Sequence, residues 1–435
     1  MSTSRKIQRV VALVVAGTLH LRAQPALPAV GADIGPHQRV WQSAASNLPG
    51  GRRSAPGRQV VEITTGMNYW DGQQWAASDP SFEVAAEGFV ATRLQHKVHL
   101  NANLNMVGAV SVTTPDGITL RSTPVGIGLY DAATGRSAVI GAIQDCAGVL
   151  VSSNQVVYEN AFSGLCADVI YTIGSGSFEQ DVLITGRLDP SEYGFPTDTT
   201  RLQIFTEFYQ APQPDRIRRP IRVEQRRSVR DRMARPDFED EVLGFGEFVL
   251  ATGRASLVGS SFRDGAATVA KEFTIIRGRT FLIESVESGS VLGKLKLLPE
   301  CSGQTAWAPK LREASKGDVG YAAPPEPSSV RQAKVATDRS GTQTVRVTVN
   351  KRAGVIIDYI ATIGGTLSGT TVFQGDTTYF VSGPVFCNGS TIIEGGAVFK
   401  YPNSTGANAT SAYLKLNNSV VSKTSSYRPA IFTGG

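Results

Sequence analysis

Residues 389–401 read Gly-Ser-Thr-Ile-Ile-Glu-Gly-Gly-Ala-Val-Phe-Lys-Tyr, and they decide the fold of the C-terminal part of the chain. Their Val-Phe pair follows Gly396, and the same pair follows Gly369 and Gly383 at a spacing of 13 residues. Short strands that stack rung on rung bury such pairs in a column, while the glycines turn the corners. A 13-residue spacing is shorter than a β-helix rung, so we expect it to cover two sides of one. A compact sandwich of similar strands is the alternative.

The composition of the whole chain predicts an all-β protein. Only 18% of the 435 residues are charged, against about 25% in an average soluble protein, and 45 are glycines. Alternating segments flank compact turns at 115–117 and 277–279, which is the pattern of antiparallel hairpins. We therefore expect an antiparallel β-sandwich-like domain over residues 59–309, a Pro-rich linker over 310–335 and rungs of a right-handed parallel β-helix over 336–435.

The N-terminus has the features of an export signal. Arg5, Lys6 and Arg9 precede ten apolar residues, and small residues follow at Ala23 and Ala32. This order predicts a signal peptide over residues 1–32, cleaved after Ala23 or Ala32, and a flexible leader over 33–58. No later apolar run reaches the length of about 20 residues that a membrane-spanning helix needs.

Export permits disulfides, and the chain has four cysteines, at positions 146, 166, 301 and 387. Spacing alone cannot choose among their three pairings. Cys146 and Cys166 fall in neighbouring predicted strands, so a bridge between them is the preferred pairing, and buried free thiols are the alternative. No Cys/His cluster with the spacing of a zinc site is present.

The chain continues with strand-like segments up to its last residue. Residues 411–416, 420–423 and 429–433 carry this pattern, and no polar cap follows them. Because an uncovered last rung would expose an apolar edge, we expect further rungs of a longer protein, or another chain, to pair with it.

Two sets of residues resemble a poorly characterised group of exported bacterial β-rich proteins. The C-terminal set comprises residues 389–401 and 426–433, which are similar to the opening rungs of right-handed parallel β-helices in that group. The other set is Tyr158, Ala161, Phe162, Ala167, Asp168, Tyr171, residues 178–182, Pro190, Tyr193, Gly194 and residues 206–208. The resemblance implies an extracellular location and a β-helix, and it carries over no catalytic residue.

Carboxylates give the first candidate site. If residues 167–173 and 178–184 form a hairpin in symmetric register, Asp168, Glu179 and Asp181 share one face of it. Three acids on one face could hold Ca²⁺ or act as an acid/base pair on a sugar. The alternative is the solvated face of a half-buried sheet.

A second set of charged residues lies in the predicted β-helix and consists of Asp358, Asp376, Glu394 and Lys400. Acids for Ca²⁺ and a base that takes a proton are the residue types that polysaccharide lyases on this fold use. Ordinary solvated charges explain the same residues. His96 and His99 are three residues apart, so they would point to opposite faces of a strand and form no metal site.

The largest charge feature is an arginine-rich segment over residues 215–235. It contains nine arginines against three acids, and without it and residues 1–32 the chain holds 30 basic and 34 acidic residues. The arginines are Arg216, Arg218, Arg219, Arg222, Arg226, Arg227, Arg230, Arg232 and Arg235. We expect an exposed loop with a short helix between residues 223 and 234. The loop could contact an anionic polymer or lipid, or it could be cleaved by a protease. The alternative is a solvated loop whose charge is balanced by the acids of residues 237–241. No aromatic residue is interleaved, which disfavours a site for single-stranded nucleic acid.

These observations favour a secreted or cell-surface bacterial protein that is structural or adhesive and not enzymatic. Its expected partner is a polysaccharide or another surface polymer, with no nucleic acid and no cofactor other than the candidate Ca²⁺. The alternative is a carbohydrate-active enzyme, either a lyase or a glycoside hydrolase, with its groove on the β-helix. No nucleophile elbow, zinc-protease, P-loop or dinucleotide motif is present.

Overall fold

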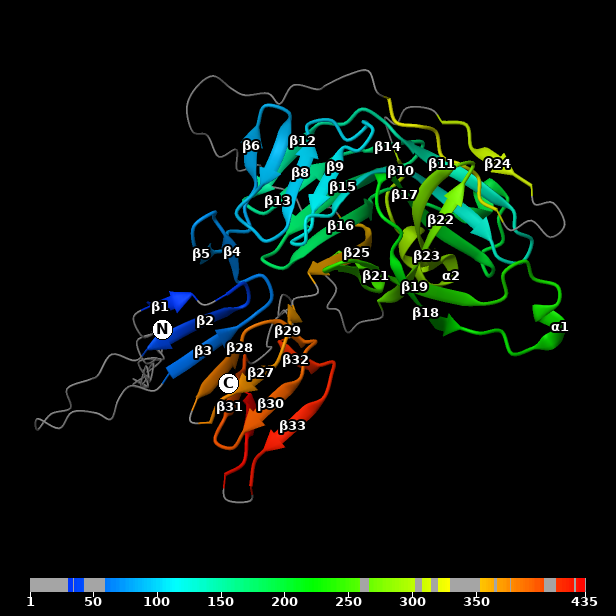
Figure 1. The fold of residues 1–435 in the computed structure, drawn as a ribbon. Helices are drawn as coiled ribbons and strands as arrows, with labels where there is room; N and C mark the ends of the chain where they lie inside the picture. Colours follow the sequence, from blue (N-terminus) through cyan, green and yellow to red (C-terminus); the bar gives the residue numbers. More distant parts are fainter. Residues whose placement is uncertain are drawn as a thin grey trace, which may run out of the picture.

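The protein is all-β, as its composition predicts, and Figure 1 shows a large body of antiparallel strands beside a smaller stack that holds the C-terminus. The computed structural model describes residues 30–33, 35–42, 59–258, 266–301, 307–313, 320–328, 353–363, 366–375, 377–402, 412–425 and 428–434. Its helical elements are η1 (Pro190–Tyr193), α1 (Arg227–Arg230) and α2 (Ser288–Leu295). None of the helices in these ranges is long and apolar enough to cross a membrane.

The large body contains two antiparallel sheets. The strand order of the first sheet is β6 (Glu83–Ala85), β7 (Gly88–Ala91), β8 (Lys97–Asn101), β9 (Val110–Thr113), β10 (Thr119–Asp131), β17 (Thr200–Gln210), β23 (Arg279–Glu287) and β22 (Ala267–Ile276). Strand β11 (Ser137–Ile143) also pairs with β10, and it pairs in turn with β14 (Phe162–Ser163) and β24 (Lys310–Arg312). The other runs β12 (Gly148–Ser152), β13 (Gln155–Tyr158), β15 (Ala167–Ile173), β16 (Ser177–Ile184) and β25 (Val355–Ile363). Strand β25 pairs in turn with β21 (Gly253–Leu257) and with β20 (Phe248–Leu250), and β20 leads on to β19 (Phe238–Phe245) and β18 (Asp215–Arg222). Because β22 also pairs with β21, the two sheets are continuous through it.

Strand β25 lies in the large body, although its residues fall in the range predicted for the β-helix. It pairs along its length with β16, from Ser177↔Thr362 to Ile184↔Val355, and its Val355, Ile357 and Ala361 are buried. The alternation of apolar residues fits a central strand covered on one face. The predicted boundary at residue 336 is therefore wrong, and the stack begins at β26 (Thr366–Leu367).

The small body is a stack of three parallel rungs, each with three strands. The first rung is β26, β27 (Thr371–Phe373) and β28 (Thr378–Val381), the second is β29 (Pro384–Cys387), β30 (Thr391–Glu394) and β31 (Val398–Tyr401), and the third is β32 (Tyr413–Leu416), β33 (Val420–Lys423) and β34 (Ile431–Gly434). Each strand pairs in parallel with its counterpart one rung on. This is the pairing that a parallel β-helix requires, and its right-handed sense stays a prediction.

The 13-residue repeat covers two sides of a rung, as expected. Thr371 pairs with Thr391 and Thr378 with Val398, so the first rung takes 20 residues over three sides. The second rung is longer, because Thr391 pairs with Val420 and Val398 with Ile431. The Val-Phe pairs accordingly fall on three different sheets, in β27, β29 and β31. They do not form one column. The column on one side consists instead of Tyr379, Phe399 and Phe432, whose rings stack in succession.

An N-terminal hairpin extends one sheet of the stack. Strands β1 (Val30–Asp33), β2 (Gln38–Gln42) and β3 (Gln59–Ile63) pair antiparallel, and β3 then pairs in parallel with β28 through Val61↔Tyr379. Residues 38–42 are therefore a strand and not part of a flexible leader, and β3 belongs to the stack and not to the predicted sandwich domain. Most of the predicted signal peptide lies outside the described residues, but β1 begins within its last three residues.

The predicted linker packs against the large body where it is described. Its first residues form β24, which pairs with β11, and Tyr321 and Ala322 are buried. The backbone N–H of Ala322 donates to Ser137 Oγ at 2.8 Å, and Arg279 Nη1 donates to the Pro324 carbonyl at 2.6 Å. Residues 320–328 are thus a strap held on the surface and not a spacer, because buried apolar side chains and backbone partners fix them.

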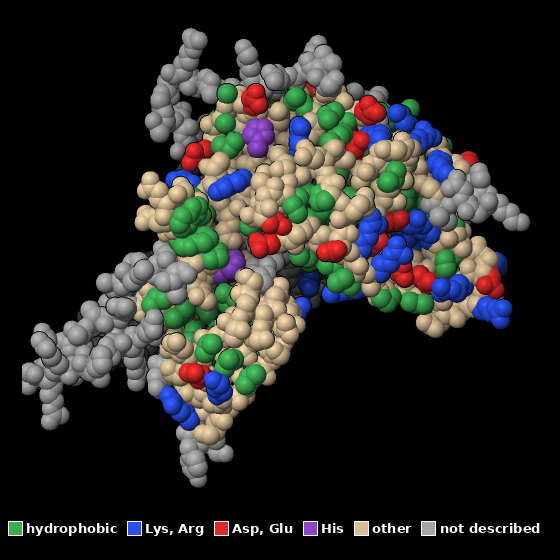
Figure 2. Space-filling model, viewed as in Figure 1, with side chains coloured by type: hydrophobic (Ala, Val, Ile, Leu, Met, Phe, Trp, Pro, Cys, Tyr) green, Lys and Arg blue, Asp and Glu red, His purple; other side chains and the backbone are tan. Residues whose placement is uncertain are grey.

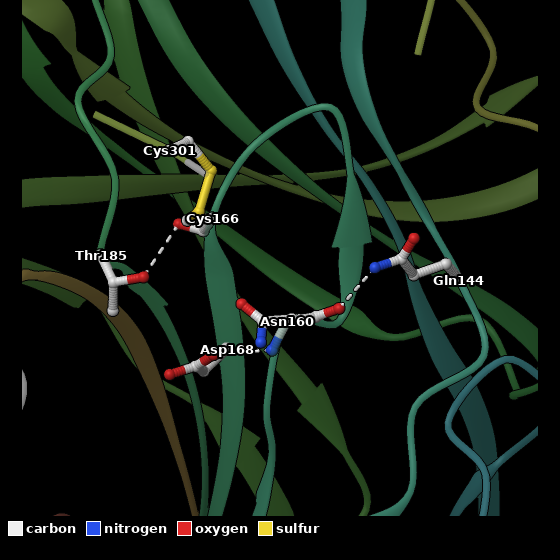
Figure 3. Close-up of a disulfide and its surroundings, with 6 residues drawn as sticks. All are labelled: Gln144, Asn160, Cys166, Asp168, Thr185 and Cys301. Carbon is white, nitrogen blue, oxygen red and sulfur yellow. Dashed lines mark hydrogen bonds between the residues drawn. A yellow bond between two sulfur atoms is a disulfide. The ribbon is translucent and has the colours of Figure 1, made fainter. Parts of the chain in front are cut away.

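The predicted disulfide is also wrong. The bridge joins Cys166 and Cys301, with a Cα–Cα distance of 5.7 Å (Figure 3), while Cys146 and Cys387 are buried free thiols. Cys166 lies just before β15, and Gly186 lies close to both bridged residues, where a Cβ would approach Cys166 Cβ to 2.9 Å. Because the bridge closes a long loop, it holds the segment after α2 against the sheet. Burial raises the pKa of Cys146 to about 12, so its thiol is unreactive at neutral pH.

Two buried histidines lie where the stack meets the large body. His37 Nδ1 accepts a hydrogen bond from the Gly66 N–H at 3.1 Å, and Gly66 itself packs on Ser175 and Gly176, between β15 and β16. His96 is fully buried beside Phe248, whereas His99 is partly exposed. Burial lowers the pKa of His37 and of His96 to about 4.

The pairing of Cys166 with Cys301 predicts that these two cysteines, and not the free thiol of Cys146, stabilise the protein through the disulfide. Because the bridge spans 135 residues, the double variant C166S/C301S should lose about 2–5 kcal/mol of unfolding free energy, measured by chemical denaturation. Wild-type protein treated with reductant should lose the same amount. The matched control C146S should remain sensitive to reductant, and a C146S protein insensitive to reductant would contradict this pairing.

The buried histidines predict a loss of stability in acid. Each has a folded-state pKa of about 4 against about 6.5 when unfolded. Their contribution to the free energy of unfolding is therefore constant above pH 6.5, and it falls as the pH drops towards 4, by on the order of 3 kcal/mol per histidine. Denaturation curves between pH 8 and 4 measure this slope. The double variant H37Q/H96L should have a flatter profile between pH 6.5 and 4 than the control H99Q, and equal slopes would exclude these two groups as the cause.

Candidate functional site

The carboxylate face on β15 and β16 has the predicted register, and one of its three acids stabilises a neighbouring turn. Val169 pairs with Val182 and Thr172 with Glu179, which places Asp168, Glu179 and Asp181 on the same face. Asp168 is buried, and its Oδ1 accepts the N–H of Asn160 at 2.7 Å (Figure 3). Asn160 has a φ of 50°, so this carboxylate stabilises a turn that non-glycine residues rarely adopt.

The second carboxylate set is divided between the two bodies. Asp358 lies on β25, opposite Asp181 in the register, whereas Glu394 and Lys400 lie in the stack and Asp376 is outside the described residues. Glu394 Oε2 accepts the Gly375 N–H at 3.1 Å, which is a contact between rungs. In the described part of the chain no three His, Cys, Asp or Glu side chains are placed to hold a metal ion.

The arginine-rich segment is a strand and a short helix, and not a loop. β18 takes residues 215–222 and is exposed throughout, and α1 lies within the range predicted for a short helix. β18 pairs with β19, which carries the acidic run, through Arg218↔Glu241 and Arg219↔Asp240. Figure 2 shows the resulting mixture of basic and acidic side chains over β18 and α1.

Most of these arginines have partners, as the interpretation of a charge-balanced surface requires. The pairs are Arg218 with Glu241 at 3.1 Å, Arg222 with Glu287 at 2.6 Å, Arg226 with Glu224 at 2.9 Å, Arg227 with Asp231 at 3.7 Å, Arg230 with Asp237 at 2.6 Å and Arg235 with Glu272 at 2.5 Å. Arg216 donates to the Phe273 carbonyl at 2.8 Å and Arg232 to the Ser228 carbonyl at 2.7 Å. Exposed pairs of this kind contribute less than about 1 kcal/mol each.

The arginine-rich segment and its neighbours line a pocket of about 400 Å³, which we call the first pocket. Its lining includes five cationic side chains from β17, β18, β22 and the segment after α1, and four acidic ones. The volume lies in the range of about 300–1,000 Å³ that is usual for small-molecule sites. The pocket is therefore large enough for one sugar-sized ligand.

The pocket is built on a buried ion pair. Lys271 and Asp240 are each 1% exposed, and Lys271 Nζ lies 2.8 Å from Asp240 Oδ1. The same carboxylate accepts the Lys271 N–H at 2.8 Å and the Thr252 hydroxyl at 2.5 Å. Because the remaining lone pairs are hydrogen-bonded, the two charges are compensated locally and bind β19 to β22.

Arg235, Glu272 and Tyr321 form one wall of the first pocket. Glu272 Oε2 accepts hydrogen bonds from Arg235 and, at 2.6 Å, from the Tyr321 hydroxyl. Burial alone would raise the pKa of Glu272, but these donors outweigh it and the net shift is downward. Burial, followed by the nearby Glu272 charge, raises the pKa of Tyr321 well above 10. The carboxylate of this wall is therefore fixed in place, because it already accepts hydrogen bonds from Arg235 and Tyr321.

Arg201 differs from the other cationic residues of this pocket. Within the described residues no carboxylate lies within ion-pair distance of its guanidinium, which is stacked 4.7 Å from the Phe238 ring. Nη2 donates to the carbonyls of Arg235 and Asp237, at 3.2 and 2.9 Å. The residue is 6% exposed, and its buried Nε has no hydrogen-bond partner in the described structure.

Other unpartnered buried atoms lie beside Arg201. They are Gln203 Oε1 and the hydroxyl of Tyr130, whose residue pairs directly with Arg201 in the sheet. Leaving one such group buried without a partner costs about 1–3 kcal/mol, so several together need an explanation such as water or a ligand. An arginine with spare donors in a pocket is suited to hold a carboxylate or sulfate group, which can take two parallel hydrogen bonds from it.

Sequence reasoning identified the rim of this pocket and missed its interior. Arg218, Arg230 and Arg235 were among the predicted residues, but Arg201, Lys271 and Glu272 were not. A signal was present, because Lys271 is in phase with the buried Val269 and Phe273 of β22. A charged residue at an inward position of an alternating strand indicates a buried ion pair.

Comparison with models of protein families, with curated proteins and with solved structures found no match to this chain.

The Lys271–Asp240 pair predicts a large loss of stability when one partner is removed. D240N leaves a buried ammonium group without its counter-charge and should lower the unfolding free energy by about 3–5 kcal/mol in urea denaturation. The double variant D240N/K271M removes both charges and should recover part of this loss. A double variant no more stable than D240N would show that the two charges are not coupled.

Proposed function

We propose that the protein is an exported, non-enzymatic surface protein that binds an anionic ligand in the first pocket. The observation that carries this proposal is Arg201, a buried arginine without a carboxylate partner in the described structure whose neighbours include two unpartnered polar atoms. A cation buried in this way is costly unless an anion compensates it. A bound carboxylate or sulfate group would compensate it.

Two features support export. Residues 1–32 have the order of charge, apolar core and small residues that signal peptides have. The Cys166–Cys301 disulfide is stable in an oxidising compartment outside the cytoplasm. Because Val30 of β1 pairs with Trp41 of β2, cleavage after Ala23 retains this pairing and is the cleavage we propose.

The stacked rungs would serve as the display part of the protein. On the third rung Tyr413, Val420, Val421, Ile431 and Phe432 are all more than 40% exposed. An exposed row of apolar residues along a strand edge is suited to pair with further β-structure. Pairing of this edge with further rungs or another chain is the partner interaction we propose for it.

The proposal predicts selective binding of acidic sugars by the mature protein. Galacturonate oligomers should bind, measured by titration calorimetry, and neutral galactose oligomers of equal length should not. R201Q should weaken binding by about 10- to 100-fold, because it removes charge-assisted hydrogen bonds, and R230Q on the pocket rim should weaken it less.

The control is R227Q, a variant of the same segment outside the pocket, which should bind as the wild type does. Thermal denaturation of each variant separates lost binding from lost folding, and R230Q keeps the test informative if R201Q does not fold. Equal binding of neutral and acidic oligomers would contradict the proposal. Shortened oligomers after prolonged incubation would contradict its non-enzymatic part.

A further inference from the structure

The stack and the large body meet at a junction of four short segments. Residues 35–37 form the turn before β2, residues 64–68 lead from β3 into β4 (Asn68–Trp70), residues 92–96 connect β7 to β8, and residues 174–177 form the turn between β15 and β16. Figure 1 shows β4 and its partner β5 (Trp75–Ala77) at this place, between the two bodies.

The two bodies have separate hydrophobic cores, and polar contacts join them at the junction. Their buried apolar side chains form two distinct clusters. Gln95 Nε2 of the large body donates to the Pro36 and Asn68 carbonyls, both at 2.7 Å, and the Thr65 N–H donates to the Pro384 carbonyl of the stack at 3.1 Å. Because each body keeps its own core, the two can part at the junction without either one unfolding.

Gly66 is the point of close approach between the connecting segment and the large body. It has a φ of 69°, and a Cβ on it would lie 2.0 Å from the Ser175 carbonyl oxygen and 2.8 Å from Gly176 Cα. The two backbones are therefore in direct contact, with no room for a side chain. The Gly66 N–H donates to His37 Nδ1 at 3.1 Å, and this bond holds the glycine in place.

His37 can accept that bond only while its Nδ1 carries no proton. A neutral imidazole accepts through one nitrogen, whereas an imidazolium donates from both. Protonation therefore sets an Nδ1–H group against the Gly66 N–H, on a side chain that is only 6% exposed. Burial lowers the pKa of His37 to about 4, so the closed junction strongly favours the neutral ring.

His96 lies on the large-body side of the same turn. It is fully buried beside Phe248, and burial is the main cause that lowers its pKa to about 4. The backbone of Ser177 raises this pKa by less, and the charge of Lys97 lowers it further. The two histidines thus contact the segments on either side of the 174–177 turn, and both are neutral when the junction is closed.

The charged groups around the histidines do not favour a further positive charge. The described elements packed there carry three cations and one acid, namely Arg39, Arg93, Lys97 and Glu62, and the 174–177 turn, β20 and β29 carry none. Glu62 already lies 4.0 Å from Arg39, and Arg93 is paired with Asp79 at 2.8 Å. A protonated histidine at the junction therefore meets like charges and acids that are already paired.

We propose that this junction is acid-sensitive: protonation of His37 and His96 releases the stack from the large body while both bodies stay folded. With a pKa of about 4 in the closed junction and about 6.5 in the open one, each histidine favours opening by about 30-fold at pH 5 and about 150-fold at pH 4, relative to neutral pH. None of the junction residues lines the first pocket, so the release is independent of the proposed anion site.

Small-angle X-ray scattering between pH 7.5 and 4 measures the opening, and hydrogen–deuterium exchange locates it. The maximum dimension of the protein should increase as the pH falls from 6.5 to 4. Over the same range, amide protection corrected for intrinsic rates should fall at residues 59–68 and 172–178. Residues 200–208 of β17 and 378–401 of the stack should stay protected, because each range lies within one body.

The matched variant is H37Q/H96L. Glutamine keeps an acceptor for the Gly66 N–H and does not titrate, and leucine suits the apolar site beside Phe248. This variant should stay closed down to pH 4, while H99Q should open as the wild type does. H37Q alone should reduce the opening at pH 5 by about 30-fold, and it decides the question if the double variant does not fold.

G66A supplies an independent test, because its Cβ collides with the 174–177 turn and should open the junction at neutral pH. A compact G66A protein would contradict the contact at Gly66. Simultaneous loss of protection in all four ranges would show that acid unfolds the protein as a whole, and constant dimensions down to pH 4 would show that nothing is released. Either result overturns the acid-sensitive junction. Opening of H37Q and of H37Q/H96L at the same pH as the wild type would exclude the histidines as its cause.

Discussion

The buried ion pair between Lys271 and Asp240 fixes the position of β19 against β22. The charged wall of the first pocket depends on that placement. β19 carries the acids that hold the arginines of β18, and β22 carries Glu272, which holds Arg235 and Tyr321. Because an uncompensated buried charge is very costly, the two strands cannot slide past each other without breaking this pair.

Charge matching around that pair explains why one cation is left over. Asp240 and Glu241 of β19 and Glu272 of β22 each accept from a neighbouring arginine, lysine or backbone N–H. Arg201 comes from β17, and among the described residues its guanidinium contacts two backbone carbonyls and the Phe238 ring. Carbonyl dipoles hold its orientation but do not neutralise its charge, and this is the basis of the anion site proposed above.

The features that depend on a local pattern of residues could be predicted from the sequence. The β15–β16 register followed from alternation, and the pairing of arginines with the acidic run followed from charge, since both are properties of neighbouring segments. The disulfide, the place of β25 and the parallel pairing of β3 with β28 depend on contacts between distant segments. A strand such as β25 has the same alternation in either body, so only the shape of its partners decides where it packs.

The first pocket also depends on the strap at residues 320–328. Tyr321 lines this pocket, yet it belongs to neither sheet. It is held there because Ala322 is hydrogen-bonded to Ser137 on β11 and because Arg279 donates to the Pro324 carbonyl while it pairs with Glu207. Pro-rich backbone has few conformations to lose when it docks, which favours a fixed strap over a mobile one. This wall is therefore preorganised, and an anion that reaches Arg201 meets donors that need little rearrangement.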